Sequence, residues 1–204
     1  MEITSKSALR KEMKACLKSF FASVTDSEKK RLDEDFRKKT ECLPEFKKAD
    51  IIFAYIPDKL EADCIPIIQD ALADKKKVAV PKVDSELLKN GRSEMDFYFL
   101  KRGRSLSCQL ESGAYGILEP KHGLKKFKIR SYFHKKRIFV IVPGLAFTPE
   151  GKRLGHGKGF YDIYMKKLKD SRHKVFLCGF CLPCQIVENL CTEEHDILMD
   201  KVIY

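Results

Sequence analysis

A glycine-rich, basic segment within residues 143–162 has the composition of a site for phosphate chemistry. Glycines let backbone N–H groups converge on an anion, and lysine and arginine side chains neutralise its charge. Asp162, just beyond the glycines, is well placed for a metal ion that bridges phosphates. An ordinary flexible turn is the alternative, but the density of glycine and basic residues argues against it. The glycines are Gly151, Gly155, Gly157 and Gly159, and between them lie Lys152, Arg153, His156 and Lys158.

The segment lies between a predicted strand and a predicted helix. Residues 138–142 form an apolar, β-branched run that predicts a buried strand, and helical spacing begins at Tyr161. Elsewhere the spacing predicts helices over 5–22, from Thr25 to Pro44, over 63–73 and over 161–168. Further strands are predicted over 51–55, 78–83, 95–100, 174–178 and 201–204. Residues 101–137 are predicted to be rich in loops.

The order of these elements defines the fold class. Strands alternate with helices and read as continuous apolar runs, which indicates a mostly parallel sheet. We therefore expect a single three-layer α/β domain over residues 1–204, with helices on both faces of the sheet. In such sheets ligands bind beyond the carboxyl ends of the strands. The loop 143–160 leaves the carboxyl end of the central predicted strand.

Common phosphate-binding motifs do not fit the segment. A Walker A sequence needs Ser or Thr after its lysine, but Gly159 follows Lys158. The dinucleotide fingerprint needs a third glycine where Phe160 stands. The chain contains no G-x-S-x-G elbow of the kind that presents a serine nucleophile. Generic motifs therefore indicate only a nucleotide- or phosphate-binding α/β protein.

The formal net charge of +11 suits a polyanionic partner. The lysines are scattered along predicted helices with acidic neighbours, as on solvated surfaces, which argues against nucleic acid. A nucleotide or a polyglutamylated cofactor would use the same charge. The sequence shows no signal-peptide pattern and no apolar run long enough to span a bilayer. We expect a cytoplasmic monomer without a membrane partner.

Eight cysteines are many for a cytosolic chain. Four are isolated and are expected to be small buried hydrophobic residues: Cys16, Cys42, Cys64 and Cys108. The run from Cys178 through Cys184, with Cys191 beyond it, has the spacing of a metal or cluster site. Its strand context, the interruption by Pro183 and the lack of a second ligand pair favour reduced structural thiols instead.

The stretch PGLAFTPEGKRLGHGKGFYD at residues 143–162 resembles the signature of the 5-formyltetrahydrofolate cyclo-ligase (methenyltetrahydrofolate synthetase) family. Its most specific part is the pattern RLG-x-G-x-G-x-YD. Further segments follow in the family's order, and the resemblance extends over essentially the whole chain. These segments are Lys6-Ser-Ala-Leu-Arg10, Tyr55 to Asp63, Gly113 to Pro120, and Glu194-His195-Asp196.

The resemblance implies an enzyme that closes 5-formyltetrahydrofolate to 5,10-methenyltetrahydrofolate, using ATP as co-substrate and Mg²⁺ and releasing ADP and phosphate. It implies catalytic roles for Arg153 and Lys158, magnesium ligation by Asp162 and Asp196, and hydrogen bonds from the pterin N–H groups to Glu61. The implied ATP-binding residues are Lys6, Arg10, Arg153, Leu154, Gly155, His156, Gly157, Lys158, Gly159, Phe160 and Tyr161. The implied folate-binding residues are Tyr55, Ile56, Glu61, Phe160 and Tyr161.

Three positions depart from the family pattern. Thr148 stands where aspartate is usual, His156 replaces the more common arginine or tyrosine, and Ala62-Asp63-Cys64 replaces V-D-T. Because an exposed loop contributes little to the core, we expect substitution of Arg153 or Lys158 to lower turnover far more than stability.

Each implied role has a structural alternative. Lys6 and Arg10 could form a solvated helix face, Asp162 and Asp196 could cap local turns, and Glu61 could be surface charge. For the whole chain the alternatives are a non-catalytic folate- or nucleotide-binding protein and an RNA-associated protein.

Overall fold

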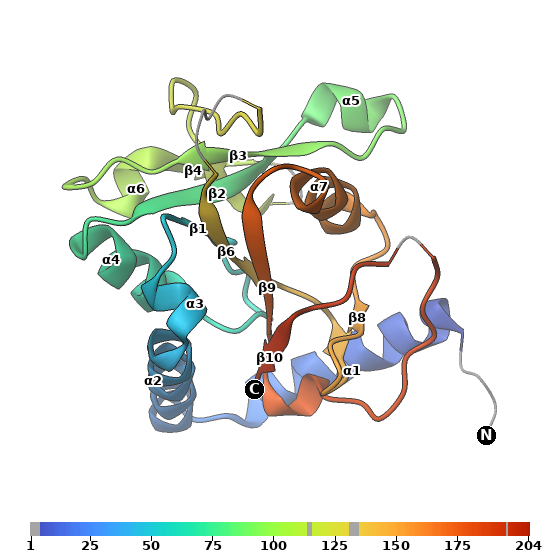
Figure 1. The fold of residues 1–204 in the computed structure, drawn as a ribbon. Coiled ribbons are helices and arrows are strands. Elements are labelled where there is room, and N and C mark those ends of the chain that lie inside the picture. Colours follow the sequence, from blue (N-terminus) through green and yellow to red (C-terminus); the bar gives the residue numbers. More distant parts are fainter. Residues whose placement is uncertain (1–4, 114–115, 131–134, 195) are drawn as a thin grey trace.

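The computed structural model describes residues 5–113, 116–130, 135–194 and 196–204. A six-stranded sheet forms its centre, made of β1 (Ile51–Phe53), β2 (Lys77–Val83), β3 (Met95–Phe99), β6 (Arg137–Val142), β9 (Lys174–Phe180) and β10 (Lys201–Ile203). The strand order is β10-β9-β6-β1-β2-β3 (Figure 1). Only the edge pair β2–β3 is antiparallel. The predicted, mostly parallel sheet is confirmed, and each predicted strand corresponds to one of these six.

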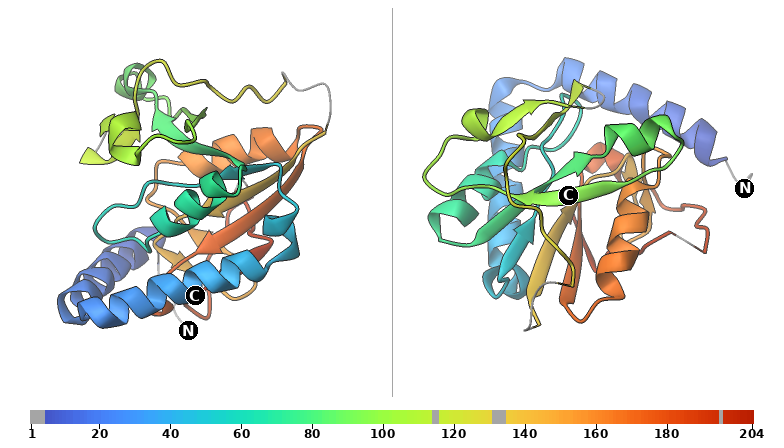
Figure 2. Two further views of the ribbon diagram at one scale, coloured as in Figure 1. Left: turned by 90° about the vertical axis from the view of Figure 1, so that its left-hand side faces the viewer. Right: turned by 90° about the horizontal axis from the view of Figure 1, so that it is seen from above.

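Helices cover both faces of the sheet, as predicted (Figures 1 and 2). One face packs against α1 (Lys6–Ser23), α2 (Asp26–Cys42), α3 (Pro44–Lys47) and α4 (Ile65–Ala73), and the other against α7 (Phe160–Lys169). Strand side chains alternate between the two sides: Ile52, Phe139 and Ile141 belong to the first core, whereas Phe53 and Val140 belong to the second. Because both sides of the sheet are buried, the central strand β1 is apolar throughout, and β6 is apolar after its first residue, Arg137.

Local sequence determines where the helices begin. Helix α2 begins after Thr25, as predicted, with a capping box: Thr25 accepts the N–H of Glu28, and the Glu28 side chain accepts the N–H of Thr25. Helix α2 ends before Pro44, which begins α3. Helix α4 starts at Ile65, later than predicted, because Oδ1 of Asp63 accepts the Ile65 N–H at 2.8 Å and holds Asp63 outside the helix.

Short elements occur in regions that the sequence predicts as loops. They are α5 (Ser85–Lys89), α6 (Leu106–Gln109), β4 (Leu110–Ser112), β5 (Leu118–Pro120), β7 (Ala146–Phe147), β8 (Arg153–Leu154) and the 3₁₀ helix η2 (Pro183–Gln185). The β4–β5 hairpin is attached to β2, since the buried Glu119 accepts the N–H of Val83 at 3.2 Å. A Cβ at Gly113 would collide with Glu119. In the family-like segment from Gly113 to Pro120, Gly113 and Glu119 therefore have a structural role.

The cysteines are buried to different degrees. Cys64, Cys178 and Cys181 are buried, Cys16 and Cys184 are half-buried, and Cys42, Cys108 and Cys191 are exposed. The prediction of burial is therefore wrong for Cys42, the last residue of α2, and for Cys108 in α6. Burial raises the pKa of the Cys178 thiol to about 12. All eight are free thiols, and no group of three or more His, Cys, Asp or Glu side chains in the described ranges could hold a metal ion.

None of the helices in the described part of the chain combines the length and apolar character needed to cross a membrane. The cytoplasmic location stays a prediction. Within the family-like segments, Ala114, Tyr115 and His195 lie outside the described residues.

Candidate active site

The chain leaves the sheet in opposite directions after its two neighbouring strands β1 and β6. From β1 it continues through α4 to β2, and from β6 it continues through α7 to β9 on the other side. Loops 54–64 and 143–159 therefore diverge from the carboxyl ends of adjacent strands (Figure 1). Open α/β sheets bind ligands at such a switch point. The predicted position of the glycine-rich loop, at the end of a central strand, is confirmed.

The first part of this loop, residues 143–154, is a packed antiparallel hairpin that we call the hairpin base. Phe147 packs against Gly179, where an added Cβ would lie 2.7 Å from its ring. At the turn, Gly151 has a φ of +97°, and its carbonyl oxygen accepts the N–H of Met199 at 2.8 Å. A Cβ at Gly151 would collide with the backbone carbonyl of Met199. The hairpin base is thus fixed both to the sheet and to the segment before β10.

Thr148, which stands at the family's aspartate position, helps to close the turn of the hairpin base. Its Oγ1 accepts the N–H of Lys152 at 3.4 Å, and its own N–H donates to the carbonyl oxygen of Lys152 at 3.0 Å. The residue is only 1% exposed. Threonine thus supplies a short side-chain acceptor, as an aspartate could, and the turn forms without a carboxylate.

Arg153 lies at the end of the hairpin base with a side chain that is only 5% exposed. Its Nη2 donates to both carboxylate oxygens of Asp162 at 2.8 Å, and its Nη1 donates to the carbonyl oxygen of Pro143 at 3.1 Å. The guanidinium also lies 5.8 Å from the ring centre of Tyr161. Its Nε is buried without a hydrogen-bond partner among the described residues. The expectation that Arg153 belongs to an exposed loop is therefore wrong, because the hairpin folds the side chain inward.

Residues 155–159 form the exposed part of the loop, which we call the glycine rim. Gly157 and Gly159 have φ values of +93° and +69°, and Gly159 is the N-cap of α7. These left-handed conformations favour glycine. The side chains of His156 and Lys158 are exposed on the rim. Its backbone N–H groups and the N-terminus of α7 are suited to an anion.

Helix α1 meets the glycine rim through Arg10. The Nε of Arg10 donates to the carbonyl oxygen of Gly155 at 3.0 Å. An added Cβ at Gly157 would lie 3.2 Å from the Arg10 guanidinium carbon. The predicted link between the first helix and the glycine-rich loop is thus present, and it adds a cation to the rim.

Lys6, one turn earlier in α1, pairs with two acidic residues from the segment before β10. Its Nζ lies 2.7 Å from Oδ2 of Asp196 and 3.0 Å from Oε1 of Glu193. Partial burial opposes the charged form, but hydrogen bonds and charge from Asp196 and Glu193 outweigh it and raise the pKa of Lys6. The Glu193 contact was not predicted, although the acidic neighbours of Asp196 in the sequence were a usable signal.

Glu61 extends from the β1 loop toward the glycine rim. Its Oε2 accepts the N–H of Asp58 at 3.0 Å, and its Oε1 lies 3.8 Å from Nε2 of His156. The Glu61 side chain is 15% exposed, which does not fit the surface-charge alternative. The structure therefore brings the predicted folate-binding carboxylate and the predicted phosphate-binding loop together.

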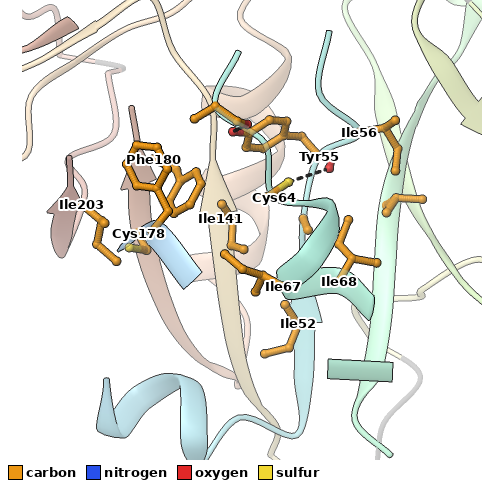
Figure 3. Close-up of a cluster of buried hydrophobic side chains, with 14 of the residues drawn as sticks. Ile52, Tyr55, Ile56, Cys64, Ile67, Ile68, Ile141, Cys178, Phe180 and Ile203 are labelled. Atoms are coloured by element: carbon orange, nitrogen blue, oxygen red, sulfur yellow. Dashed lines mark hydrogen bonds between the residues drawn. The ribbon is translucent and has the colours of Figure 1, made fainter. Parts of the chain in front are cut away.

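Tyr55 and Ile56 are buried where the chain leaves β1 (Figure 3). The Tyr55 hydroxyl donates to the carbonyl oxygen of Ala62 at 2.6 Å, and the Cys64 thiol donates to the carbonyl oxygen of Tyr55 at 3.1 Å. Burial, with nearby acidic groups, keeps the pKa of Tyr55 well above its ordinary value. These contacts close the loop that presents Glu61. Cys64, at the threonine position of the family pattern, keeps a side-chain donor there.

Phe160 and Tyr161 begin α7 and are both half-buried. The Tyr161 hydroxyl is buried without a hydrogen-bond partner among the described residues. Burial raises the pKa of Tyr161 well above its ordinary value, and the charges of Glu61 and Cys64 act in the same direction. Tyr161 therefore lies between the ion pair of Arg153 and the loop that carries Glu61.

The comparisons with known proteins agree with this arrangement. A sequence model of the 5-formyltetrahydrofolate cyclo-ligase family matches residues 2–204. A probable 5-formyltetrahydrofolate cyclo-ligase of Caenorhabditis elegans is 28% identical over 203 residues, covering 96% of this chain and 92% of the relative. A second, from Schizosaccharomyces pombe, is 32% identical over 155 residues, covering 72% of this chain and 70% of the relative.

Solved structures show the same likeness. The NMR structure of Aquifex aeolicus 5,10-methenyltetrahydrofolate synthetase is 31% identical, with a TM-score of 0.71 over 97% of this chain and 88% of that chain. The synthetase from Mycoplasma pneumoniae, 20% identical with a TM-score of 0.68 over 98% of each chain, supports the fold alone. From sequence and fold together, the chain belongs to the 5-formyltetrahydrofolate cyclo-ligase family of enzymes.

Proposed function

We propose that this enzyme uses ATP and Mg²⁺ to convert 5-formyltetrahydrofolate to 5,10-methenyltetrahydrofolate, releasing ADP and phosphate. The observation that carries the proposal is the meeting of two loops at the ends of β1 and β6. The 3.8 Å approach of His156 to Glu61 brings a loop suited to phosphate beside a loop that presents a carboxylate. A reaction that joins a nucleotide and a second substrate needs such adjacent sites.

The chemical problem is a poor leaving group. The formyl oxygen cannot leave as hydroxide at neutral pH, so we propose that it first receives the γ-phosphoryl group of ATP. N10 of the folate then attacks the activated formyl carbon, and the oxygen leaves within phosphate. The formyl oxygen is thereby transferred to phosphate, and the folate ring closes. The protein contributes positioning and charge neutralisation.

In this proposal the glycine rim and the start of α1 hold the ATP phosphates. Backbone N–H groups of the rim, together with the N-terminus of α7, are suited to the phosphate oxygens. Lys158 is an exposed cation and can reach a bound phosphoryl group. Arg10 is already placed on the rim by its bond to Gly155. The Nε of the buried Arg153 has no hydrogen-bond partner among the described residues, and its Nη2 holds Asp162 in place.

The donor set also fits Mg²⁺. Asp162 and Asp196 offer hard carboxylate oxygens, and each is paired with a cation, Arg153 or Lys6, that is suited to phosphate. Mg²⁺ usually binds through one or two carboxylates with water and substrate phosphates, so it needs no larger protein cage. When bound, Mg²⁺ would neutralise phosphate charge. Hydrogen bonds from Arg153 and Lys6 orient the two carboxylates.

On the folate side we propose that Glu61 accepts hydrogen bonds from the aminopyrimidine N–H groups. Its bond from the Asp58 N–H fixes the carboxylate, and a carboxylate retains capacity for further donors. The hydroxyl of Tyr161, which has no hydrogen-bond partner among the residues that the structure describes, offers a donor to the same ligand, while Phe160 flanks it. Tyr55 and Ile56 support the loop from beneath.

The proposal is tested by mixing purified protein with 5-formyltetrahydrofolate, ATP and Mg²⁺ and following the absorbance band of the methenyl product. We expect product formation that stops when ATP is omitted. A flat trace from folded protein would contradict the proposal. Thermal stabilisation by folate but not by ATP, together with a flat trace, would identify a non-catalytic folate-binding protein instead.

A further inference from the structure

The excess positive charge of the chain is concentrated in three short segments, residues 125–130, 135–137 and 166–174, which we call the basic patch. They contain 12 of the 40 lysine and arginine residues but only one of the 29 acidic residues, Asp170. Their formal charge of +11 equals that of the whole chain, so the remaining 28 basic and 28 acidic residues sum to zero. Lysines with acidic neighbours argued against nucleic acid, but in these segments the acidic neighbours are missing.

The fold brings the three segments together at the starts of β6 and β9 and the end of α7. The buried His173 joins them, because its Nδ1 accepts the N–H of Lys136 at 3.2 Å and its Nε2 donates to the carbonyl oxygen of Ile129 at 3.0 Å. Arg137 and Lys174 begin β6 and β9 and are partners in register. The glycine rim precedes α7 and the patch contains its last turn, so ten helical residues, about 15 Å, separate the two.

Acidic residues from other segments offset part of the charge. Counting the three that form ion pairs leaves the patch with a formal charge of +8. Cations near the end of a helix also interact favourably with its dipole, but this explains only the lysines of α7. The three ion pairs are Arg137 with Asp50, Lys126 with Asp96, and Lys169 with Asp200.

A hollow makes part of the basic patch concave. It has a volume of about 570 Å³ and is lined by Ile129, Arg130, Lys167, Asp170, Ser171 and Arg172. Three of these residues are cations, and a guanidinium can donate two parallel hydrogen bonds to a phosphate. The aromatic rings of the three segments, Phe127 and His173, are buried, so bases cannot stack on them. The chemistry of the patch therefore suits phosphate groups rather than bases.

We propose that the basic patch binds duplex nucleic acid through the phosphate backbone, without recognition of the bases. A duplex carries closely and regularly spaced phosphates, which can occupy the hollow and the cations around it at the same time. The flat surface of an anionic bilayer would not reach into the hollow. This binding function is additional to the proposed reaction with ATP and folate and does not depend on it.

The test is the binding of a fluorescein-labelled duplex of about 20 base pairs, as DNA and as RNA, followed by anisotropy between about 50 and 200 mM salt. We expect a Kd of about 10⁻⁶ to 10⁻⁴ M near physiological salt, independent of base sequence and rising steeply with salt. Arg130→Gln/Lys167→Gln removes two phosphate contacts. It should weaken binding on the order of 10-fold at low salt and reduce the slope of log Kd against log salt by about 2.

Matched variants separate the basic patch from net charge and from the glycine rim. Lys18→Gln/Lys30→Gln removes the same charge from exposed positions of α1 and α2 and should bind the duplex as wild type does. Lys158→Ala removes a cation from the rim and should also bind as wild type does. Because all five side chains are exposed, the melting temperatures should equal that of wild type.

Four results would overturn the proposal. They are equal weakening by the two double variants, loss of binding in Lys158→Ala, no binding of either duplex at about 50 mM salt, and binding of phosphatidylserine vesicles without binding of a duplex. The second result would place the duplex on the glycine rim, and the last would identify a membrane instead. None of them bears on the proposed ligase reaction, which the methenyl product tests separately.

Discussion

The hairpin base and the glycine rim are adjacent in one sequence motif but differ in physical character. In the base, Arg153 is buried in an ion pair with Asp162, and Gly151 is in contact with a neighbouring backbone. In the rim, His156 and Lys158 are exposed. The difference indicates that residues of one family signature perform two tasks. We propose that the base builds the site and that the rim contacts the ligand, so substitutions should separate into two classes.

Arg153→Ala should have the largest effect, because it lowers stability as well as turnover. The substitution leaves the partly buried carboxylate of Asp162 without its partner, which costs about 3 kcal/mol of unfolding free energy. Urea unfolding measures the loss. Arg137→Ala is the matched control, since Arg137 pairs with Asp50 at an exposed position, and it should cost less than about 1 kcal/mol. Similar losses for the two variants would contradict a buried, structural role for Arg153 in the base.

Lys158→Ala should affect turnover alone. Removing one exposed cation from the transferring phosphoryl group should reduce kcat roughly 100-fold. The unfolding free energy should stay within about 0.5 kcal/mol of wild type, as for other surface substitutions. Lys166→Ala, on the exposed side of α7, should change neither quantity. If Lys158→Ala lowered the unfolding free energy together with kcat, Lys158 would have a structural role like the residues of the hairpin base, and this prediction would be wrong.

Two glycine substitutions compare base and rim with the same chemical change. Gly151→Ala and Gly157→Ala both place a Cβ on a residue with positive φ. At Gly151 the methyl group meets the Met199 backbone, whereas at Gly157 it meets the movable end of Arg10. We expect losses of about 2 to 3 kcal/mol for Gly151→Ala and about 1 kcal/mol for Gly157→Ala. Thermal unfolding of the two variants checks this order, and equal losses would contradict it.

The smallest effect on stability is expected for Asp50→Asn. Asp50 and its partner Arg137 lie at the starts of β1 and β6, at the end opposite to the site. Burial alone would raise the pKa of Asp50, but the backbone N–H, side chain and charge of Arg137 lower it. A lowered native pKa adds stability above the unfolded-state value, and this stability is lost as pH falls through the native pKa. Asp50→Asn should therefore melt slightly below wild type at pH 7, with the gap closing below about pH 4. A gap that persists in acid would contradict this account, and kcat should be unchanged.

Sequence patterns were sufficient for the main elements of the fold. The apolar patterns of the sequence located all six strands of the central sheet, and the capping box at Thr25 and Glu28 located the start of α2. The patterns missed β7 and β8, because two-residue strands among glycines leave no periodic signal. The helix start at Ile65 was misplaced because the side chain of Asp63 binds that N–H from outside the helix.

The candidate site was less predictable from sequence than the fold. The resemblance indicated which residues matter, and the structure brings Arg10 and Glu61 to the glycine rim as the resemblance implied. The resemblance could not indicate that the Arg153 side chain turns inward. Asp162 reaches Arg153 only because Gly159 turns the chain into α7. The approach of His156 to Glu61 likewise depends on two loops meeting across adjacent strands, which no local pattern encodes.

We propose that the two loops place ATP beside the formyl oxygen of the folate. The most direct measurement uses 5-formyltetrahydrofolate labelled with ¹⁸O in the formyl group, with wild-type protein, ATP and Mg²⁺. We predict that each turnover yields one methenyl product, one ADP and one phosphate that carries the label. Label released into water, or product formed without ADP, would contradict transfer of the phosphoryl group to the formyl oxygen.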